Sequence, residues 1–207
     1  TENLTLKAGV NLVAYECDST TPNVTIIGTP TLTAAGTVSI SGIRLQTNSA
    51  ALLAVTGSAA SIVILNDCYL NCTNNTGITF SSSSGSARIQ LNNCQGDLGT
   101  TGIGVFTHSS AGNLRFLNTI FTNSGASSTA STCSAGSFTL LNSYLANPVT
   151  MSGTGFITGK YSEIDSSATN STSLTTVTGT TNEVHFFRLA SGSATPLSVG
   201  GTLTANQ

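Results

Sequence analysis

The dipeptide Leu-Asn recurs at a nearly fixed interval through the middle of the chain, and this repeat decides the expected fold. Its four copies are Leu65-Asn66, Leu91-Asn92, Leu117-Asn118 and Leu141-Asn142. An identical dipeptide at one phase of a long period indicates stacked structural repeats, each advancing by one inter-strand distance of about 4.8 Å. We therefore expect coils of about 24–26 residues that stack in parallel, with the four asparagines in one column.

Other phases of the period support this prediction. An earlier, degenerate copy places Ile40 and Ser41 at the phase of Leu65 and Asn66. Phe80 and Phe106 follow the first two repeat asparagines at the same distance along the chain, so we expect their rings to stack inside the coils. The copy at Asn118 conflicts with those at Asn66 and Asn92, because a charged residue, Arg115, stands where they carry an apolar one. We expect a shift of the inward-facing positions there, of the kind that a β-bulge produces.

The composition favours a nearly all-β chain and excludes two classes of function. Only 7% of the 207 residues are charged, whereas 29 are Ser and 35 are Thr. The six Lys and Arg residues are scattered and the net charge is −2, which excludes nucleic-acid binding, because phosphate neutralisation needs clustered cations. No apolar run reaches about 18 residues, so we expect no membrane insertion. A hydrophobic fraction of 39%, set in short Val, Ile and Leu runs, argues for strands rather than disorder.

The extent of the repeat divides the chain into two parts. Residues 1–168 are expected to form the β-helix body. Residues 169–207 hold a Ser/Thr-rich segment and C-terminal strands, for which the last coils, a cap and an oligomerisation region are all open alternatives. Because the chain opens inside a strand-like pattern, Leu4-Thr5-Leu6, we expect it to be a piece of a longer protein.

The Leu-Asn turns resemble the asparagine ladder of the right-handed parallel β-helices of the pectate-lyase-like superfamily. The opening stretch 1–13 and the stretch 23–28 are similar to first coils of that family, and the resemblance covers about residues 1–165. It implies an all-β, single-stranded, right-handed parallel β-helix. Asn suits such a ladder because it tolerates left-handed backbone geometry and its amide both donates and accepts hydrogen bonds. The alternative is four unrelated turns in an Asn-rich chain.

No catalytic, cofactor-binding or metal-binding residue is expected. The acidic residues form two i, i+2 pairs, Glu16 with Asp18 and Glu163 with Asp165, each of which could share one strand face or lie in a solvated turn. Polysaccharide lyases and glycosidases of this fold would need a carboxylate cluster, and none is visible. Asp67 is interpreted as a turn residue.

The remaining reactive residue types also point away from a reactive centre. His108 is interpreted as a surface residue in a polar turn and His185 as an exposed strand residue. The five cysteines lack metal-ligand spacing, and their odd number argues against a complete disulfide framework. Cys68 and Cys94 share one phase of the repeat, and we expect them to be buried free thiols; a redox or disulfide pair is the alternative.

Two functions from different classes fit these observations. The composition, which is rich in Ser, Thr and Gly and poor in charge, looks most like that of bacteriophage tailspike and tail-fibre β-helices. That resemblance implies a structural and adhesive protein of the virion tail or another extracellular surface. It also implies binding to a host-surface polysaccharide and assembly into a homotrimer. We expect the segment from Val184 to Leu189 to join the trimer interface and the Ser/Gly turn 124–137 to form the contact edge. The alternative is a polysaccharide lyase or glycoside hydrolase on the same fold.

Overall fold

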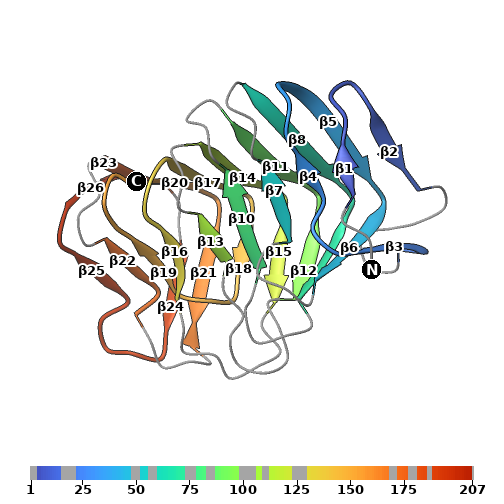
Figure 1. Ribbon diagram of the computed structural model, residues 1–207. Helices are drawn as coiled ribbons and strands as arrows, with labels where there is room; N and C mark the ends of the chain where they lie inside the picture. The colour runs from blue at the N-terminus through green and yellow to red at the C-terminus, as the bar shows by residue number, and fades with distance from the viewer. Residues whose placement is uncertain are drawn as a thin grey trace.

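The short apolar runs of the sequence form strands that pair in parallel, coil upon coil, and build a β-solenoid with essentially no helix in the part of the chain that the structure describes (Figure 1). The structure is a computed structural model, and it describes residues 4–14, 22–47, 52–55, 60–72, 78–82, 87–97, 106–108, 112–122, 130–167, 172–176, 181–185 and 188–206. Successive strands of the chain belong to sheets 1, 2 and 3 in turn, so each coil adds one strand to each sheet. The predicted fold class, an all-β parallel solenoid, is confirmed, and its right-handed winding stays a prediction.

Within the described residues, sheets 1 and 2 have nine strands each and sheet 3 has eight. Sheet 1 consists of β1 (Thr5–Leu6), β4 (Thr31–Leu32), β7 (Leu53–Val55), β10 (Ile78–Ser82), β13 (Phe106–His108), β16 (Ser131–Cys133), β19 (Val149–Met151), β22 (Leu174–Thr176) and β25 (Leu197–Val199). Sheet 2 consists of β2 (Asn11–Val13), β5 (Gly36–Ser41), β8 (Ser61–Asn66), β11 (Arg88–Asn92), β14 (Asn113–Leu117), β17 (Ser137–Leu141), β20 (Phe156–Lys160), β23 (Thr181–His185) and β26 (Thr202–Asn206). Sheet 3 consists of β3 (Val24–Ile27), β6 (Ile43–Thr47), β9 (Tyr69–Cys72), β12 (Gln95–Asp97), β15 (Ile120–Thr122), β18 (Tyr144–Leu145), β21 (Glu163–Ser166) and β24 (Arg188–Ser191).

The core is a set of side-chain stacks that run along the solenoid axis. Alternate residues of each strand point inward, as the two-residue period of a strand requires. In sheet 2, the register places Leu65, Leu91, Phe116 and Leu140 in one inward row, and all four are almost completely buried. The Phe116 ring lies with its centroid 5.1 Å from those of both Phe121 and Phe138. The widest side chains therefore meet in the middle of the rod.

The strand register confirms the degenerate repeat but corrects the single asparagine column. Ser41 pairs with Asn66, and Asn66 pairs with Asn92, as the repeat predicts. Asn92, however, pairs with Leu117, so Asn118 lies one residue further along, inside the turn. The predicted column of four is wrong at this step, because the coil that begins after Asn92 is one residue shorter than the Leu-Asn spacing suggests.

This offset also removes the expected bulge. Strand β14 pairs residue for residue with both β11 and β17, so Leu114 and Phe116 face inward and Arg115 faces outward without any insertion. Phe80 and Phe106 are not register partners, and because their side chains lie outside what the structure describes, their stacking stays a prediction. The register pairs Phe106 with Ile78, and it pairs Phe80 with Leu53.

The C-terminal strands continue the same three sheets. Strands β22 to β26 pair with β19, β20, β21, β22 and β23 in turn, so the described part of residues 172–206 consists of further coils. Within the predicted interface segment, Leu189 packs against the core, and residues 186–187 lie outside the described part. A role of this segment in oligomerisation stays a prediction. The predicted contact edge lies partly outside the described residues, up to residue 129.

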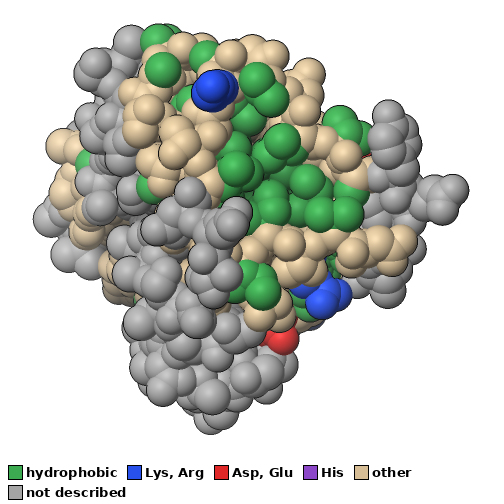
Figure 2. All heavy atoms as spheres, turned by 45° about the vertical axis from the view of Figure 1, so that its right-hand side comes forward, with side chains coloured by type: hydrophobic (Ala, Val, Ile, Leu, Met, Phe, Trp, Pro, Cys, Tyr) green, Lys and Arg blue, Asp and Glu red, His purple; other side chains and the backbone are tan. Residues whose placement is uncertain are grey.

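The N-terminal end of the rod is apolar at its surface. Figure 2 shows hydrophobic side chains gathered there. A small hollow of about 190 Å³ is lined mainly by Leu4, Leu6, Val10, Leu12 and Val38. Among the described residues, no helix has the length and apolar character needed to cross a lipid bilayer.

Candidate functional site

The turn between sheets 2 and 3 has the same backbone shape in successive coils. One residue of each turn has a left-handed backbone, and in the described coils this position holds Gly42, Asp67, Asn93, Asn118, Asn142 and Tyr161, with φ between 48° and 68°. The N–H of each of these residues donates to a carbonyl of the following coil, for example Asn118 N to Leu141 O at 3.0 Å. Gly, Asn and Asp are the residue types that adopt this geometry at least cost.

Tyr161 is the exception in this column. Bulky side chains rarely adopt a left-handed backbone, which costs roughly 1–2 kcal/mol for an L-residue. Tyr161 has a φ of 50°, and 63% of its surface is exposed. Burial of the ring therefore does not offset the cost of its backbone. Residues kept in unfavourable backbone geometry concentrate at functional sites.

A second ladder of small polar side chains lies inside the same turns. The residue after Gly42 is the apolar Ile43, whereas the residues after the other five left-handed positions are, in order, Cys68, Cys94, Thr119, Ser143 and Ser162. Each donates to the carbonyl two residues before it, as in Ser143 Oγ to Leu141 O at 2.8 Å. The hydroxyls also accept backbone bonds from the preceding coil: Thr119 N donates to Ser143 Oγ, and Ser143 N donates to Ser162 Oγ, both at 3.1 Å. These buried polar groups thus fix the turn from within.

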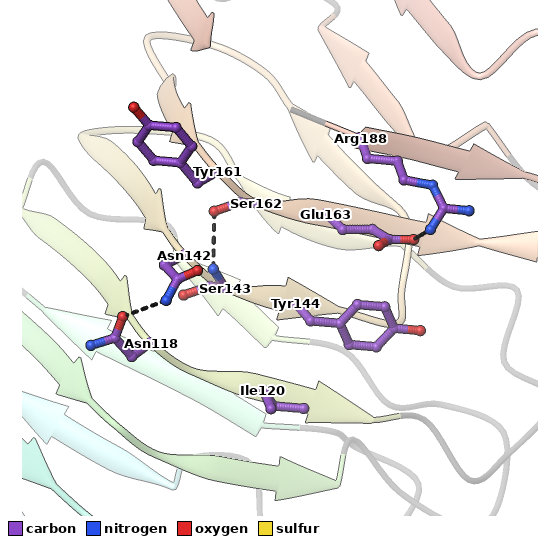
Figure 3. Close-up of a pocket in the computed structure, with 9 residues that line it drawn as sticks. All are labelled: Asn118, Ile120, Asn142, Ser143, Tyr144, Tyr161, Ser162, Glu163 and Arg188. Carbon is purple, nitrogen blue, oxygen red and sulfur yellow. Dashed lines mark hydrogen bonds and ion pairs between the residues drawn. The ribbon is translucent and has the colours of Figure 1, made fainter. Parts of the chain in front are cut away.

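Tyr161 borders a shallow groove of about 550 Å³ on the outer face of sheet 3 (Figure 3). We call it the tyrosine groove. Its lining comprises Asn118, Ile120, Asn142, Ser143, Tyr144, Tyr161, Ser162, Glu163 and Arg188. Ile120, Tyr144, Glu163 and Arg188 are paired in register on β15, β18, β21 and β24, so they form one outward row along the axis. The two tyrosine rings and Ile120 provide apolar surface, and the amides of Asn118 and Asn142 provide polar groups at one edge.

The charged groups of the groove are tied to one another. Glu163 Oε1 lies 2.8 Å from Arg188 Nη1, and the Arg188 side chain is 73% exposed. Tyr144 Oη donates to Asp165 Oδ2 at 3.2 Å, and Asp165 Oδ1 accepts from Ser167 N at 2.8 Å. Partial burial raises the pKa of Asp165, but the hydrogen bonds from Ser167 and Tyr144 and the charge of Arg188 outweigh it and leave that pKa below its ordinary value. Burial, with the neighbouring Asp165 charge, raises the pKa of the Tyr144 hydroxyl.

The structure places the predicted acidic pairs differently. Glu163 and Asp165 share the outward face of β21, so the strand-face alternative holds for them and the solvated-turn interpretation is wrong. Glu16 and Asp18 lie outside the described residues. Asp67 is a turn residue, as predicted.

The histidines also depart from their interpretation. His108 ends strand β13, opposite Cys133, rather than lying in a polar turn. His185 is half-buried, with Nε2 3.9 Å from Glu183 Oε2. No group of three or more His, Cys, Asp or Glu residues that could hold a metal ion occurs in the described part of the chain.

The predicted thiol stack is confirmed. Cys68 and Cys94 are buried and unpaired in adjacent coils, and Cys133 is a third buried free thiol. The hydrogen bond with Cys68, together with burial, raises the pKa of Cys94, and burial raises the pKa of Cys133 to about 12. The thiols of Cys94 and Cys133 are therefore protonated at neutral pH and serve as core and turn residues. The side chain of Cys72 and the whole of Cys17 lie outside what the structure describes.

The tyrosine groove suits the binding of a neutral or weakly polar ring system. Aromatic faces stack on the apolar faces of flat ligands, and the surrounding amide, hydroxyl and carboxylate groups can hydrogen-bond ligand hydroxyls. The sequence did not predict Tyr161 and Tyr144 as site residues, because the repeat was traced through the recurring asparagine alone. The available signal was Gly159-Lys160-Tyr161, which resembles another turn but follows Asn142 sooner than the repeat period predicts.

Comparison with protein-family models, with curated proteins and with solved structures found no significant match. The parallel solenoid fold is therefore shown by the pairing of its sheets alone. Membership of the pectate-lyase-like superfamily stays a resemblance.

Proposed function

We propose that this chain is the rigid body of a surface adhesin, of the phage tail-fibre or tailspike kind, and that it binds a host-surface glycan in the tyrosine groove. The observation that carries the proposal is Tyr161, an exposed aromatic residue at a left-handed position where preceding coils carry Gly, Asp or Asn. A solenoid whose coils are fixed by two side-chain ladders supports the role of a stiff scaffold. Binding residues concentrate on the turns and loops that a rigid scaffold positions, and Tyr161 lies in such a turn.

The groove's lining favours a sugar over other small ligands. Tyr144 and Tyr161 present ring faces, while the Asn118 and Asn142 amides and the Glu163–Arg188 pair surround them with hydrogen-bonding groups. A pyranose ring has one apolar face and a rim of hydroxyls, which matches this combination. The groove is open along the row of outward residues, so it accommodates an internal stretch of a polysaccharide.

A homotrimer of the virion tail or another extracellular surface forms part of this proposal. Only 14 of the 207 side chains are charged, counting six Lys and Arg and eight Asp and Glu, and low net charge favours association. Exposed apolar residues outside the tyrosine groove, such as Val24 and Ile27, add surface that a neighbouring copy can cover. Light scattering tests the assembly: a mass near three times 20.9 kDa supports the trimer, and a mass near 20.9 kDa contradicts it for this chain.

The enzymatic alternative receives less support from the groove. A glycosidase needs one carboxylic acid with a raised pKa to protonate the leaving group. The pKa of Asp165 lies below its ordinary value, and Glu163 is ion-paired with Arg188. Incubation with host capsule or lipopolysaccharide distinguishes the two functions, because a hydrolase yields new reducing ends and a lyase yields unsaturated sugars.

Binding to an array of bacterial surface polysaccharides tests the proposal. We expect the chain to bind selected glycans and Tyr161→Asn to lose that binding, because the substitution removes the ring but keeps the turn. Tyr69→Asn is the matched control: Tyr69 lies in the same outward row of sheet 3, two strands beyond Ile120 and outside the groove. Equal binding by the parent and Tyr161→Asn, or equal loss in both variants, would contradict the proposal.

A further inference from the structure

The outer face of sheet 2 concentrates positive charge in a chain that has little charge. Arg88, Arg115 and Lys160 lie on β11, β14 and β20, and they are three of the six Lys and Arg residues of the whole sequence. The outward positions of β11, β14, β17 and β20 include no carboxylate. We call the surface of these four described strands the basic face; the strands lie side by side in Figure 1.

The two arginines are incompletely satisfied within the described residues. The Nε atoms of Arg88 and Arg115 are both buried, and neither has a hydrogen-bond partner there. Arg44 shows the same feature in sheet 3, but its guanidinium lies over the Tyr69 ring, 5.1 Å from the centroid. A buried unsatisfied donor on a charged group is unfavourable, and an anion or a water molecule held against it would remove that cost.

A hollow of about 380 Å³ lies between two of the basic residues. Its lining is Arg115, Leu117, Thr139, Leu140, Leu141, Thr158 and Lys160. Arg115, Thr139 and Thr158 are register partners on β14, β17 and β20, so Arg115 and Thr158 are about 10 Å apart along the axis, two strand spacings. Lys160 follows Thr158 by two positions on the same face. The long Arg115 and Lys160 side chains can therefore reach one anion above the two threonine hydroxyls.

We propose that the basic face binds the carboxylate or sulfate groups of an acidic polysaccharide. Arginine binds such groups with two parallel N–H donors, and the Thr139 and Thr158 hydroxyls offer further donors. Leu117 and the exposed Leu141 provide apolar surface beside the cations, which suits the ring of a sugar. An opposing charge adjoins the hollow: Glu183 on β23 pairs in register with Thr158, and its Oε2 lies 3.9 Å from His185 Nε2. This inference rests on the proposed function for the choice of a glycan as the polyanion.

Titration with polygalacturonate, dextran sulfate and neutral dextran tests the inference on the full chain. We expect the two acidic polymers to bind, with an affinity that falls as salt is added, and neutral dextran not to bind. Polygalacturonate alone identifies carboxylate as the group recognised, and dextran sulfate alone identifies sulfate. Arg115→Gln and Lys160→Gln should each weaken binding about tenfold, because each removes a charge-assisted contact. Lys7→Gln, which removes an exposed cation at the N-terminal end, is the matched control.

Three results would overturn the inference. They are failure of both acidic polymers to bind, equal weakening by Lys7→Gln, and equal or tighter binding of duplex DNA. Thermal melting of each variant separates lost binding from lost folding. Tyr161→Asn should retain acidic-polymer binding, so failure of the tyrosine groove and failure of the basic face give different results.

Discussion

The turns of the N-terminal coils carry side-chain ladders at two adjacent positions, whereas those of the C-terminal coils carry one. At the left-handed position of the N-terminal turns, the Asn93 amide donates to Asp67 Oδ1. At Asn66 and Asn92 the amides lie at the last strand position, where Asn92 Nδ2 donates to Asn66 Oδ1 at 2.9 Å. At Asn118 and Asn142 the amides lie one residue later, at the left-handed position, with the same 2.9 Å bond between them. The same backbone turn thus accommodates an amide ladder either at the last strand residue or at the left-handed residue that follows it.

The inner ladder changes at the same step. The N-terminal turns carry the thiols Cys68 and Cys94, whose contacts to carbonyls are 3.3–3.5 Å long. The C-terminal turns carry Thr119, Ser143 and Ser162, and the hydroxyls of Ser143 and Ser162 also accept backbone N–H groups. The C-terminal turns are therefore fixed more tightly, and it is there that a costly residue, Tyr161, is tolerated.

The largest effect is expected from breaking the inner ladder in the C-terminal turns. Ser143→Ala removes the oxygen that accepts from the buried Thr119 N–H, and it should destabilise the chain by about 2–3 kcal/mol. Cys94→Ala removes only a sulfur with weak contacts and should cost about 1 kcal/mol. Urea unfolding of the two variants checks the ordering, and equal losses would show that the two ladders are equivalent.

The second-largest effect tests the one-residue offset between Asn92 and Asn118. Asn118→Thr places a β-branched residue at a left-handed position and should cost roughly 1–2 kcal/mol, whereas Asn92→Thr occupies an ordinary strand position and should cost well under about 1 kcal/mol. Thermal melting measures both variants. If Asn92→Thr were the more damaging substitution, the asparagines would not occupy different positions of the turn.

A smaller effect concerns the thiols. Titration with a thiol reagent after denaturation should find five reactive groups, because Cys68, Cys94 and Cys133 are free and buried. A reducing agent should leave the unfolding midpoint unchanged. Finding three or fewer thiols would contradict this expectation.

The smallest effect is the pH dependence from Asp165. Its pKa is lowered on folding, so its stabilising contribution is complete above the unfolded pKa of about 3.9 and is lost as the pH falls through the folded pKa. Because the group is largely solvated, we expect a difference below about 1 kcal/mol. Acid titration of stability in the parent and in Asp165→Asn measures it, and a variant that loses as much stability as the parent between pH 5 and 3 would remove Asp165 from the account.

Sequence reasoning recovered the coils but not the offset between the two regions. Leu91 faces inward and Leu117 faces outward, yet each precedes an asparagine, so the dipeptide is the same in two registers. Only pairing with the neighbouring coil distinguishes them. The sequence did contain one sign of the change in register: Arg115 is charged, and a charged side chain does not suit an inward position.

The groove could not be predicted for a related reason. Tyr161 departs from the amide pattern, and the coil that precedes it is shorter than those before it, because a tight turn at residues 152–155 joins β19 to β20. A search for asparagine therefore ended at Asn142. The outward row of Ile120, Tyr144 and Glu163 depends on the stacking of separate coils, which no local pattern reports.

The most direct test of the account measures stability and glycan binding together in Tyr161→Asn. We expect this variant to be more stable than the parent by about 1 kcal/mol, because Asn relieves the left-handed strain and extends the Asn118–Asn142 ladder by one coil. We also expect the variant to lose binding to the surface polysaccharides that the parent binds. A variant that is less stable than the parent and still binds them would contradict the account, because Tyr161 would then serve the fold and not the ligand.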